Sequence, residues 1–179
     1  ELNGKQALYF TGNSLGLQPK SAESYLKQEL EDWRKYGVEG HFEARRPWYS
    51  YHEFFSKAMA EIAGAKESEV VAMGSLTANI HSLMASFYHP TKTRYKILCE
   101  KKAFPSDVHA VTSQIQHHGL DPAIALVEIA PREGELNLRD EDIETAILCE
   151  GDSLALVMFS GVQYYTGQFF DLARITAAG

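Results

Sequence analysis

The chain has 179 residues, of which 45% are hydrophobic and 23% charged, proportions that are typical of a globular protein and exclude a disordered or collagen-like chain. Its 17 basic residues do not cluster and are outnumbered by 24 acidic ones, giving a net charge of -7 that excludes nucleic acid as a partner. No apolar run is long enough to cross a bilayer and no leader opens the chain, so we expect neither a membrane partner nor secretion. Both cysteines end apolar runs and resemble core residues rather than a disulfide pair, so we expect a soluble protein of the cytoplasm.

Two amphipathic helices are predicted in the first part of the chain, over residues 19–36 and 51–63, from apolar residues at helical spacing. Residues 37–48 between them contain two glycines and a proline and lack periodicity, which predicts a long loop. Long loops often carry function, and His41 in this loop is therefore a candidate functional residue. The alternative is a solvated loop histidine without a role.

Strand-like and helix-like patterns alternate from residue 70 onward. The predicted strands cover residues 70–73, 94–99, 123–129 and 153–159, and the predicted helices cover residues 77–88, 105–118 and 140–150. The last strand is apolar on both faces, which indicates a parallel sheet covered by helices on each side. The fold class is therefore α/β, with a mostly parallel, open, doubly wound sheet that binds ligands at the carboxyl ends of its strands.

The loop after the first predicted strand suits a phosphate group. Gly74, Ser75 and Thr77 stand at the start of a predicted helix, where backbone N–H groups are free and a glycine permits close approach. The alternative is that the hydroxyls only cap the helix, which is the more frequent role of such residues.

A second candidate position follows the next strand. Phe104 and Pro105 precede the pair Ser106 and Asp107 at the start of a helix, an arrangement that also describes an ordinary capped helix with a core phenylalanine. Because the two positions follow successive strands, one ligand can contact both, and a flat phosphorylated ring has the required shape. Ser160 adds a hydroxyl at a third strand end, without the glycines of a nucleophile elbow.

Residue spacing disfavours nucleotide and metal sites. No Gly-Lys-[Ser/Thr] ends the loop before residue 78, and no Gly-x-Gly-x-x-Gly occurs in the chain. None of the seven histidines stands in a metal-binding spacing such as His-Glu-x-x-His. These observations disfavour nucleotides, dinucleotides and zinc as ligands.

Several segments, in this order, resemble the kynureninase family over nearly the whole chain. They are residues 9–19, 40–48, 76–79, 94–98, 102–107, 131–134 and 159–168, of which Gly-Asn-Ser-Leu-Gly and Phe-Pro-Ser-Asp are the most specific. The resemblance implies the aspartate aminotransferase fold, pyridoxal 5'-phosphate (PLP) as cofactor, and cleavage of L-kynurenine to anthranilate and L-alanine. It further implies 3-hydroxykynurenine as a substrate, a place in tryptophan catabolism and NAD biosynthesis, and a homodimer with the active site at its interface.

The resemblance also implies residues that contact the cofactor. Leu76 and Thr77 match the pair that binds the PLP phosphate, and Phe104 matches the aromatic residue that stacks on the pyridine ring. The remaining positions that match cofactor contacts are Pro105, Ser106, Asp107 and Ser160.

Two residues of the first part match positions that face the substrate. These are Ser14 and His41, which the resemblance places in the smaller domain of the family. It implies that residues 1–48 contribute to the small domain and the substrate side, and that residues 49–179 form the first part of an incomplete large PLP-binding domain.

The lysine that holds the cofactor as a Schiff base is absent from the chain. None of its ten lysines stands in the family's Ser-x-Lys context, so we expect this segment alone to be inactive, with no catalytic residue of its own. One alternative is another PLP enzyme of the same fold, such as a cysteine desulfurase or an aminotransferase. A second alternative is a non-catalytic binding module that has kept the cofactor cleft.

Overall fold

The computed structural model of the protein describes residues 3–12 and 14–179. The chain divides into two compact units, Glu1–Ala72 and Met73–Gly179. The predicted boundary after residue 48 concerns the domains of the longer family members, and that assignment stays a prediction. No helix in the described part of the chain has the length and apolar character needed to span a membrane.

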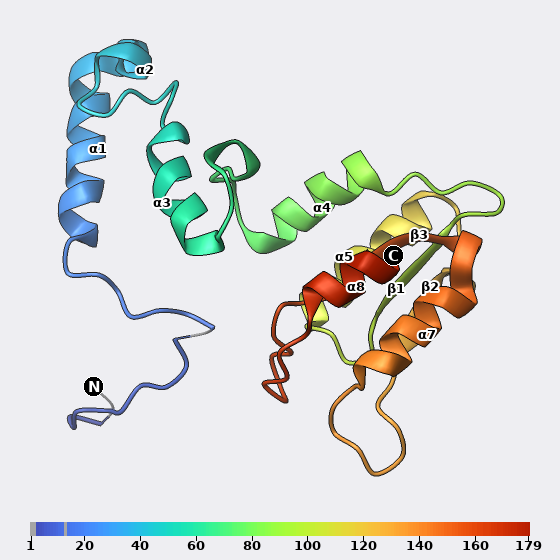
Figure 1. Ribbon diagram of the computed structural model, residues 1–179. Coiled ribbons are helices and arrows are strands. Elements are labelled where there is room, and N and C mark those ends of the chain that lie inside the picture. The colour runs from blue at the N-terminus through green and yellow to red at the C-terminus, as the bar shows by residue number, and fades with distance from the viewer. Residues whose placement is uncertain (1–2, 13) are drawn as a thin grey trace. The chain divides into compact units, whose positions relative to one another are not determined.

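The second unit contains a parallel sheet of three strands in the order β2-β1-β3 (Figure 1). The central strand is β1 (Lys96–Glu100), with β2 (Leu126–Ile129) on one side and β3 (Leu154–Met158) on the other. In this register Cys99 pairs with Glu128 of β2 and Met158 of β3. The α/β class and the parallel sheet predicted from the apolar strands are thus confirmed.

Helices cover both faces of this sheet. The other elements of the unit are α4 (Leu76–Phe87), α5 (Pro105–His117), α6 (Pro122–Ala125), α7 (Asp140–Glu150), η3 (Gly151–Ser153) and α8 (Leu172–Ala178). Ile97 faces the apolar cluster built with α4 and α5, whereas Leu98 faces the cluster built with α7 and α8. Burying each of these side chains contributes about 1.5–3 kcal/mol, so adjacent residues of one strand stabilise two separate layers.

Two predicted strands differ from the structure. Residues 70–73 are extended at Val70 but form no ladder in the described part of the chain, and an apolar pattern alone cannot supply a hydrogen-bonding partner. The predicted strand 123–129 begins as the helical turn α6, because Asp121 accepts a hydrogen bond from the Ala123 N–H and Pro122 occupies the first helical position.

The first unit contains helices from residue 22 onward. They are α1 (Ala22–Tyr36), η1 (Gly37–Glu39), α2 (Gly40–Glu43), α3 (Glu53–Ala63) and η2 (Glu67–Glu69). Both predicted amphipathic helices are confirmed, each beginning two or three residues later than expected. The predicted long loop 37–48 is wrong in its first half, which forms the helical turns η1 and α2. A Cβ on Gly40 would lie 2.4 Å from the Trp48 ring, and periodicity does not report this close packing.

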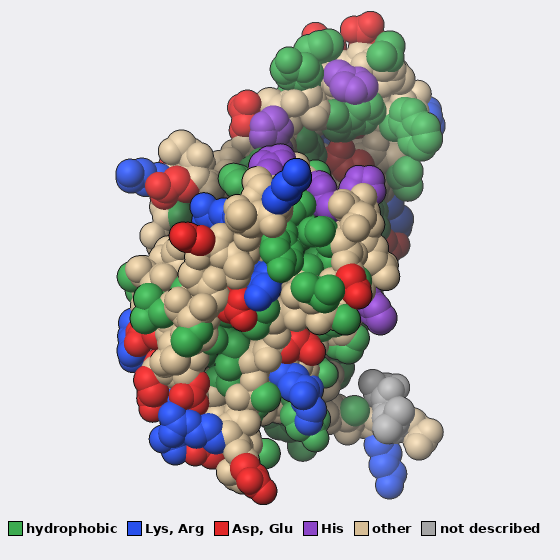
Figure 2. All heavy atoms as spheres, turned by 90° about the vertical axis from the view of Figure 1, so that its right-hand side faces the viewer, with side chains coloured by type: hydrophobic (Ala, Val, Ile, Leu, Met, Phe, Trp, Pro, Cys, Tyr) green, Lys and Arg blue, Asp and Glu red, His purple; other side chains and the backbone are tan. Residues whose placement is uncertain are grey.

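Charged side chains of both signs are interspersed over the face seen in Figure 2. Several form ion pairs, including Arg132 with Asp142 at 2.6 Å and Lys96 with Glu150 at 2.6 Å. The first pair is partly exposed at Arg132 and contributes about 0–1 kcal/mol. The second is mostly shielded from solvent and links β1 to the end of α7.

Candidate functional site

The start of α4 presents backbone N–H groups to a ligand. Ser75 is the N-cap, and its hydroxyl accepts a hydrogen bond from the Ala78 N–H at 3.4 Å. The first N–H groups of a helix have no partner within it, so those of Leu76 and Thr77 remain for another acceptor. The helix dipole adds a partial positive charge at this end, which favours an anion.

The loop before α4 is held by Asn79. Its Oδ1 accepts a hydrogen bond from the Gly74 N–H at 3.1 Å, and its Nδ2 donates to the Gly74 carbonyl oxygen at 3.4 Å. The N–H and the carbonyl group of Gly74 are therefore both fixed by the Asn79 side chain in the first turn of α4. This shapes the loop before any ligand binds.

The start of α5 has a similar arrangement. The N–H groups of Asp107 and Val108 donate to the Phe104 carbonyl oxygen at 2.9 and 3.1 Å, and Pro105 has no N–H to offer. The Ser106 N–H at the second helical position therefore remains for a ligand. The Ser106 hydroxyl donates to Asp107 Oδ1 at 3.1 Å, so this side chain is already engaged with its neighbour.

The Phe104 ring offers a flat apolar surface beside these groups. The side chain is 47% exposed. Tyr164, from the segment after β3, packs edge to face against it with ring centroids 5.0 Å apart and an interplanar angle of 86°. Such edge-to-face pairs are favourable and orient both rings. The exposed part of Phe104 is left for a second flat ring.

The starts of α4 and α5 point to the same side of the sheet. The two helices pack in one apolar cluster, and His81 Nδ1 lies 2.9 Å from Gln114 Nε2 between them. Beyond their ends, the rings of Tyr88 and His118 lie 5.2 Å apart. The helices therefore run in the same direction, and their N-termini lie toward the carboxyl edge of the sheet, where α5 follows β1.

Ser160 lies at the same edge, beyond the end of β3. Its hydroxyl donates to Glu100 Oε1 at 2.9 Å, and Glu100 is the last residue of β1 with only 3% of its surface exposed. Burial raises the pKa of Glu100, and the negative charge of Asp107 adds to this, while the Ser160 hydrogen bond lowers it in part. Glu100 was missed by sequence reasoning, and the only signal was an acidic residue ending a buried strand.

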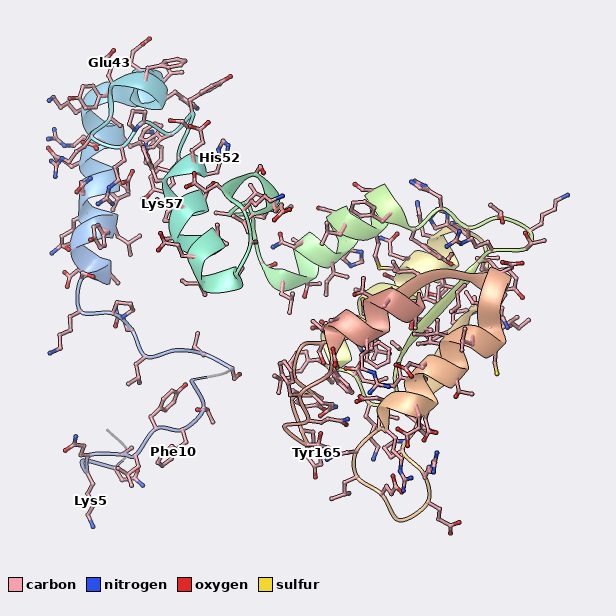
Figure 3. The ribbon with its side chains drawn as sticks, viewed as in Figure 1. Lys5, Phe10, Glu43, His52, Lys57 and Tyr165 are labelled. Atoms are coloured by element: carbon pink, nitrogen blue, oxygen red, sulfur yellow. The ribbon has the colours of Figure 1, made fainter. Side chains whose placement is uncertain are left out.

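A second buried polar residue ties the loops after β1 and β3 together. Gln163 is 7% exposed, and its Nε2 donates to the Lys102 carbonyl oxygen at 2.8 Å. Its Oε1 accepts from the N–H groups of Tyr165 at 2.6 Å and Thr166 at 2.9 Å. Tyr165 itself projects from the loop after β3 (Figure 3). Gln163, also missed from the sequence, thus fixes the segment that presents Tyr164 to Phe104.

A cavity of about 570 Å³ opens beside these loops. Its lining includes Lys101, Lys102, Leu138, Tyr164 and Gln163. It lies between the loops that follow β1, β2 and β3, and Phe104 and Ser160 are not among its lining residues. Phe104 and Ser160, which suit a phosphorylated ring, therefore lie outside this cavity.

His41 belongs to the first unit, on α2. Its Nδ1 lies 2.8 Å from the Val38 carbonyl oxygen, and its ring packs edge to face on Trp48 with centroids 5.5 Å apart. Trp48 in turn donates from Nε1 to Glu29 Oε2 of α1 at 3.0 Å. Asp32, which is buried in α1, accepts a hydrogen bond from the Arg45 N–H at 3.1 Å. The segment around His41 is therefore held against α1.

Ser14 also belongs to the first unit and is exposed. Its N–H donates to the Thr11 carbonyl oxygen at 3.0 Å, which closes a turn. Asn13 of the same motif lies outside the described residues. The structure thus groups Ser14 and His41 in one unit and the residues at the sheet edge in the other, and the substrate-facing role of both stays a prediction.

The described residues favour neither a metal site nor a reactive thiol. Among these residues no group of three or more His, Cys, Asp or Glu side chains has a metal-binding arrangement. Burial raises the pKa of the Cys99 thiol to about 12, so it remains protonated near neutral pH and is a poor nucleophile. Cys149 is exposed on α7.

No protein-family model matches the chain. Curated kynureninases match it over nearly its whole length. Those of Flavobacterium psychrophilum, Nematostella vectensis and Rattus norvegicus are 57%, 53% and 53% identical, over 98%, 97% and 97% of the chain. The matched regions cover 41%, 37% and 37% of these relatives, so the chain spans about two fifths of their length. The resemblance drawn from the sequence motifs is thereby confirmed.

Proposed function

The chain belongs to the kynureninase family, and on this premise we propose that the complete protein is a PLP-dependent hydrolase that cleaves L-kynurenine to anthranilate and L-alanine. The observation that carries the proposal is that two helix starts, an exposed aromatic ring and a hydroxyl all lie toward the carboxyl edge of one parallel sheet. This is the position where open α/β sheets bind their ligands. We further propose activity on 3-hydroxykynurenine and a role in tryptophan catabolism and NAD biosynthesis.

The residues at this edge fit a phosphorylated pyridine ring. A dianionic phosphate requires several donors and a favourable potential, and the N–H groups of Leu76, Thr77 and Ser106 at two helix starts meet both requirements. The half-exposed Phe104 ring offers a stacking surface for the pyridine. When bound, PLP supplies the electron sink that makes bonds at the amino acid's Cα breakable.

The cofactor-facing residues have distinct tasks in this proposal. Thr77 adds a hydroxyl donor to the backbone N–H groups that bind the phosphate. Phe104, held by Tyr164, sets the plane of the ring. Pro105, Ser106 and Asp107 shape the start of α5 beside it, and Ser160 contacts the ring from the end of β3.

His41 has a defined tautomer in this proposal. The Val38 carbonyl oxygen can only accept a hydrogen bond, so the neutral ring carries its proton on Nδ1 and leaves Nε2 as an acceptor. An acceptor suits the amino group, or the added hydroxyl, of an aromatic kynurenine side chain. We propose that His41 and Ser14 recognise this part of the substrate.

The assembly and location follow the family pattern in this proposal. The complete protein is a homodimer of the cytoplasm with its active site at the subunit interface. Residues 1–48 contribute to the small domain and residues 49–179 to the large one. The lysine that anchors PLP lies in the longer protein, outside the residues of this chain.

The test is the substrate range of the purified complete protein loaded with PLP. Release of fluorescent anthranilate from L-kynurenine, with alanine in equal amount, is the expected result. Release of alanine from cysteine without action on kynurenine would favour a desulfurase. Absence of both activities and of PLP binding would favour a non-catalytic binding module.

A further inference from the structure

We propose that Glu100 is a positioning residue of the candidate site, which holds the Ser160 hydroxyl in the orientation in which it contacts the cofactor. The inference rests on the proposed function, because Ser160 is placed beside PLP there. It adds a residue that does not itself touch the ligand and that no sequence motif indicated.

The geometry of the pair sets its role. Glu100 ends the central strand β1, and Ser160 follows the neighbouring strand β3 by two residues. The register that pairs Cys99 with Met158 brings the ends of the two strands side by side. The hydrogen bond of 2.9 Å from Ser160 Oγ to Glu100 Oε1 therefore bridges them at the carboxyl edge.

The burial of this carboxyl is costly. Glu100 is 3% exposed, and burial raises its pKa. Hydrogen bonds from the Ser160 hydroxyl and from the backbone at Glu100 and Ser160 offset this in part, and no cation of the described chain contributes. Its neighbours Ile97 and Leu98 in the same strand are apolar and equally buried. A side chain required only for packing would be apolar here as well, because removing a carboxyl from water is unfavourable even when it accepts hydrogen bonds. Costly buried carboxyls at ligand-binding edges often serve function.

The pair also determines whether the proton or the lone pairs of the Ser160 hydroxyl face the ligand. A hydroxyl has one proton, and in this pair the Ser160 hydroxyl directs it to Glu100 Oε1. The Ser160 oxygen therefore turns its lone pairs toward the ligand. Removing the negative charge weakens this hold, since bonds to charged acceptors are about twice as strong as neutral ones.

The central variant is Glu100→Gln in the complete, PLP-loaded protein. The amide keeps the size of the side chain but replaces a charged acceptor by a neutral one. We expect kcat/KM for kynurenine to fall about tenfold and the absorption band of bound PLP to shift. The same substitution made in a Ser160→Ala background should leave the band where Ser160→Ala alone puts it, because Glu100 acts through Ser160.

The matched control is Glu150→Gln at the opposite end of the sheet. Glu150 also accepts a hydrogen bond from a serine, Ser153 Oγ at 3.0 Å, and pairs with Lys96. This variant should leave both kcat/KM and the PLP band unchanged. An effect equal to that of Glu100→Gln would show that the loss is general and would overturn the proposal.

The outcomes separate this inference from the proposed function. If Glu100→Gln leaves turnover and the PLP band unchanged, or shifts the band equally with and without Ser160, the positioning role is wrong. If the parent protein binds PLP but does not cleave kynurenine, the proposed reaction is wrong, while the band positions still test Glu100. If the parent protein does not bind PLP, both proposals are overturned.

Discussion

Replacing Thr77 by alanine tests the phosphate-binding role of the α4 start. Thr77 is exposed at the second position of this helix, so its truncation leaves no cavity. Alanine is the better helix former by at most about 0.7 kcal/mol, which slightly favours the folded state. The lost interaction is a hydrogen bond to a charged phosphate, worth about 1.5–3 kcal/mol. This corresponds to PLP binding that is weaker by about 10- to 150-fold.

The affinity is measured by titrating the cofactor-free complete protein with PLP and following the absorbance of the bound form. Thr145→Ala is the matched control, since Thr145 lies exposed on α7 with its hydroxyl bonded to the Glu141 carbonyl oxygen at 2.6 Å. Thermal unfolding of the cofactor-free variants separates stability from affinity. An unchanged Kd for Thr77→Ala, or an equal loss for Thr145→Ala, would refute the phosphate site.

Four further predictions concern other parts of the chain. Replacing His41 by Asn should change kynurenine turnover while PLP stays bound, and an unaltered rate would leave it a structural residue. Gly40→Ala forces a Cβ into the Trp48 ring and should lower the free energy of unfolding by about 1–3 kcal/mol, with a change in tryptophan fluorescence. Cys99, with a pKa of about 12, should react with iodoacetamide only after unfolding. Burial raises the pKa of Glu100 in the folded protein above its unfolded value of 4.5. The stability that the protonated carboxyl contributes is therefore fully present below pH 4.5 and is lost as the pH rises through the folded pKa. Glu100→Gln should thus stabilise the protein against urea near pH 7 and not at pH 4.

Local signals predicted much of the second unit. Residues 140–150 form α7 with the predicted bounds, because three acidic residues open the helix and Gly151 ends it with a positive φ. The apolar run at 153–159 became the strand β3, shortened by one residue at each end. The bounds of α7 are set by neighbours in sequence, and the apolar character of β3 on both faces is a local signal of a buried strand.

The errors arose where a distant partner decides the outcome. Residues 70–73 have the composition of a strand, but a ladder needs a second segment at hydrogen-bonding distance. The helical turn α2 begins at Gly40, which packs closely against the Trp48 ring. Local periodicity contains no information about either contact.

The candidate site was predicted in part for the same reason. The helix starts at Thr77 and Ser106 follow from capping and proline rules that act within a few residues. Glu100 reaches Ser160 across 60 positions of sequence, through a strand register that composition does not specify. The buried residues Glu100 and Gln163, whose hydrogen bonds hold the loops of the site, were therefore found only in the structure.

The most direct test of the central claim is one titration of the complete, PLP-loaded protein with L-kynurenine. Absorbance follows the bound cofactor and fluorescence follows anthranilate in the same sample. We predict that kynurenine perturbs the PLP band and that anthranilate and alanine appear in equal amounts. A PLP band that kynurenine leaves unchanged, with no anthranilate formed, would contradict the assignment of this sheet edge to kynurenine cleavage.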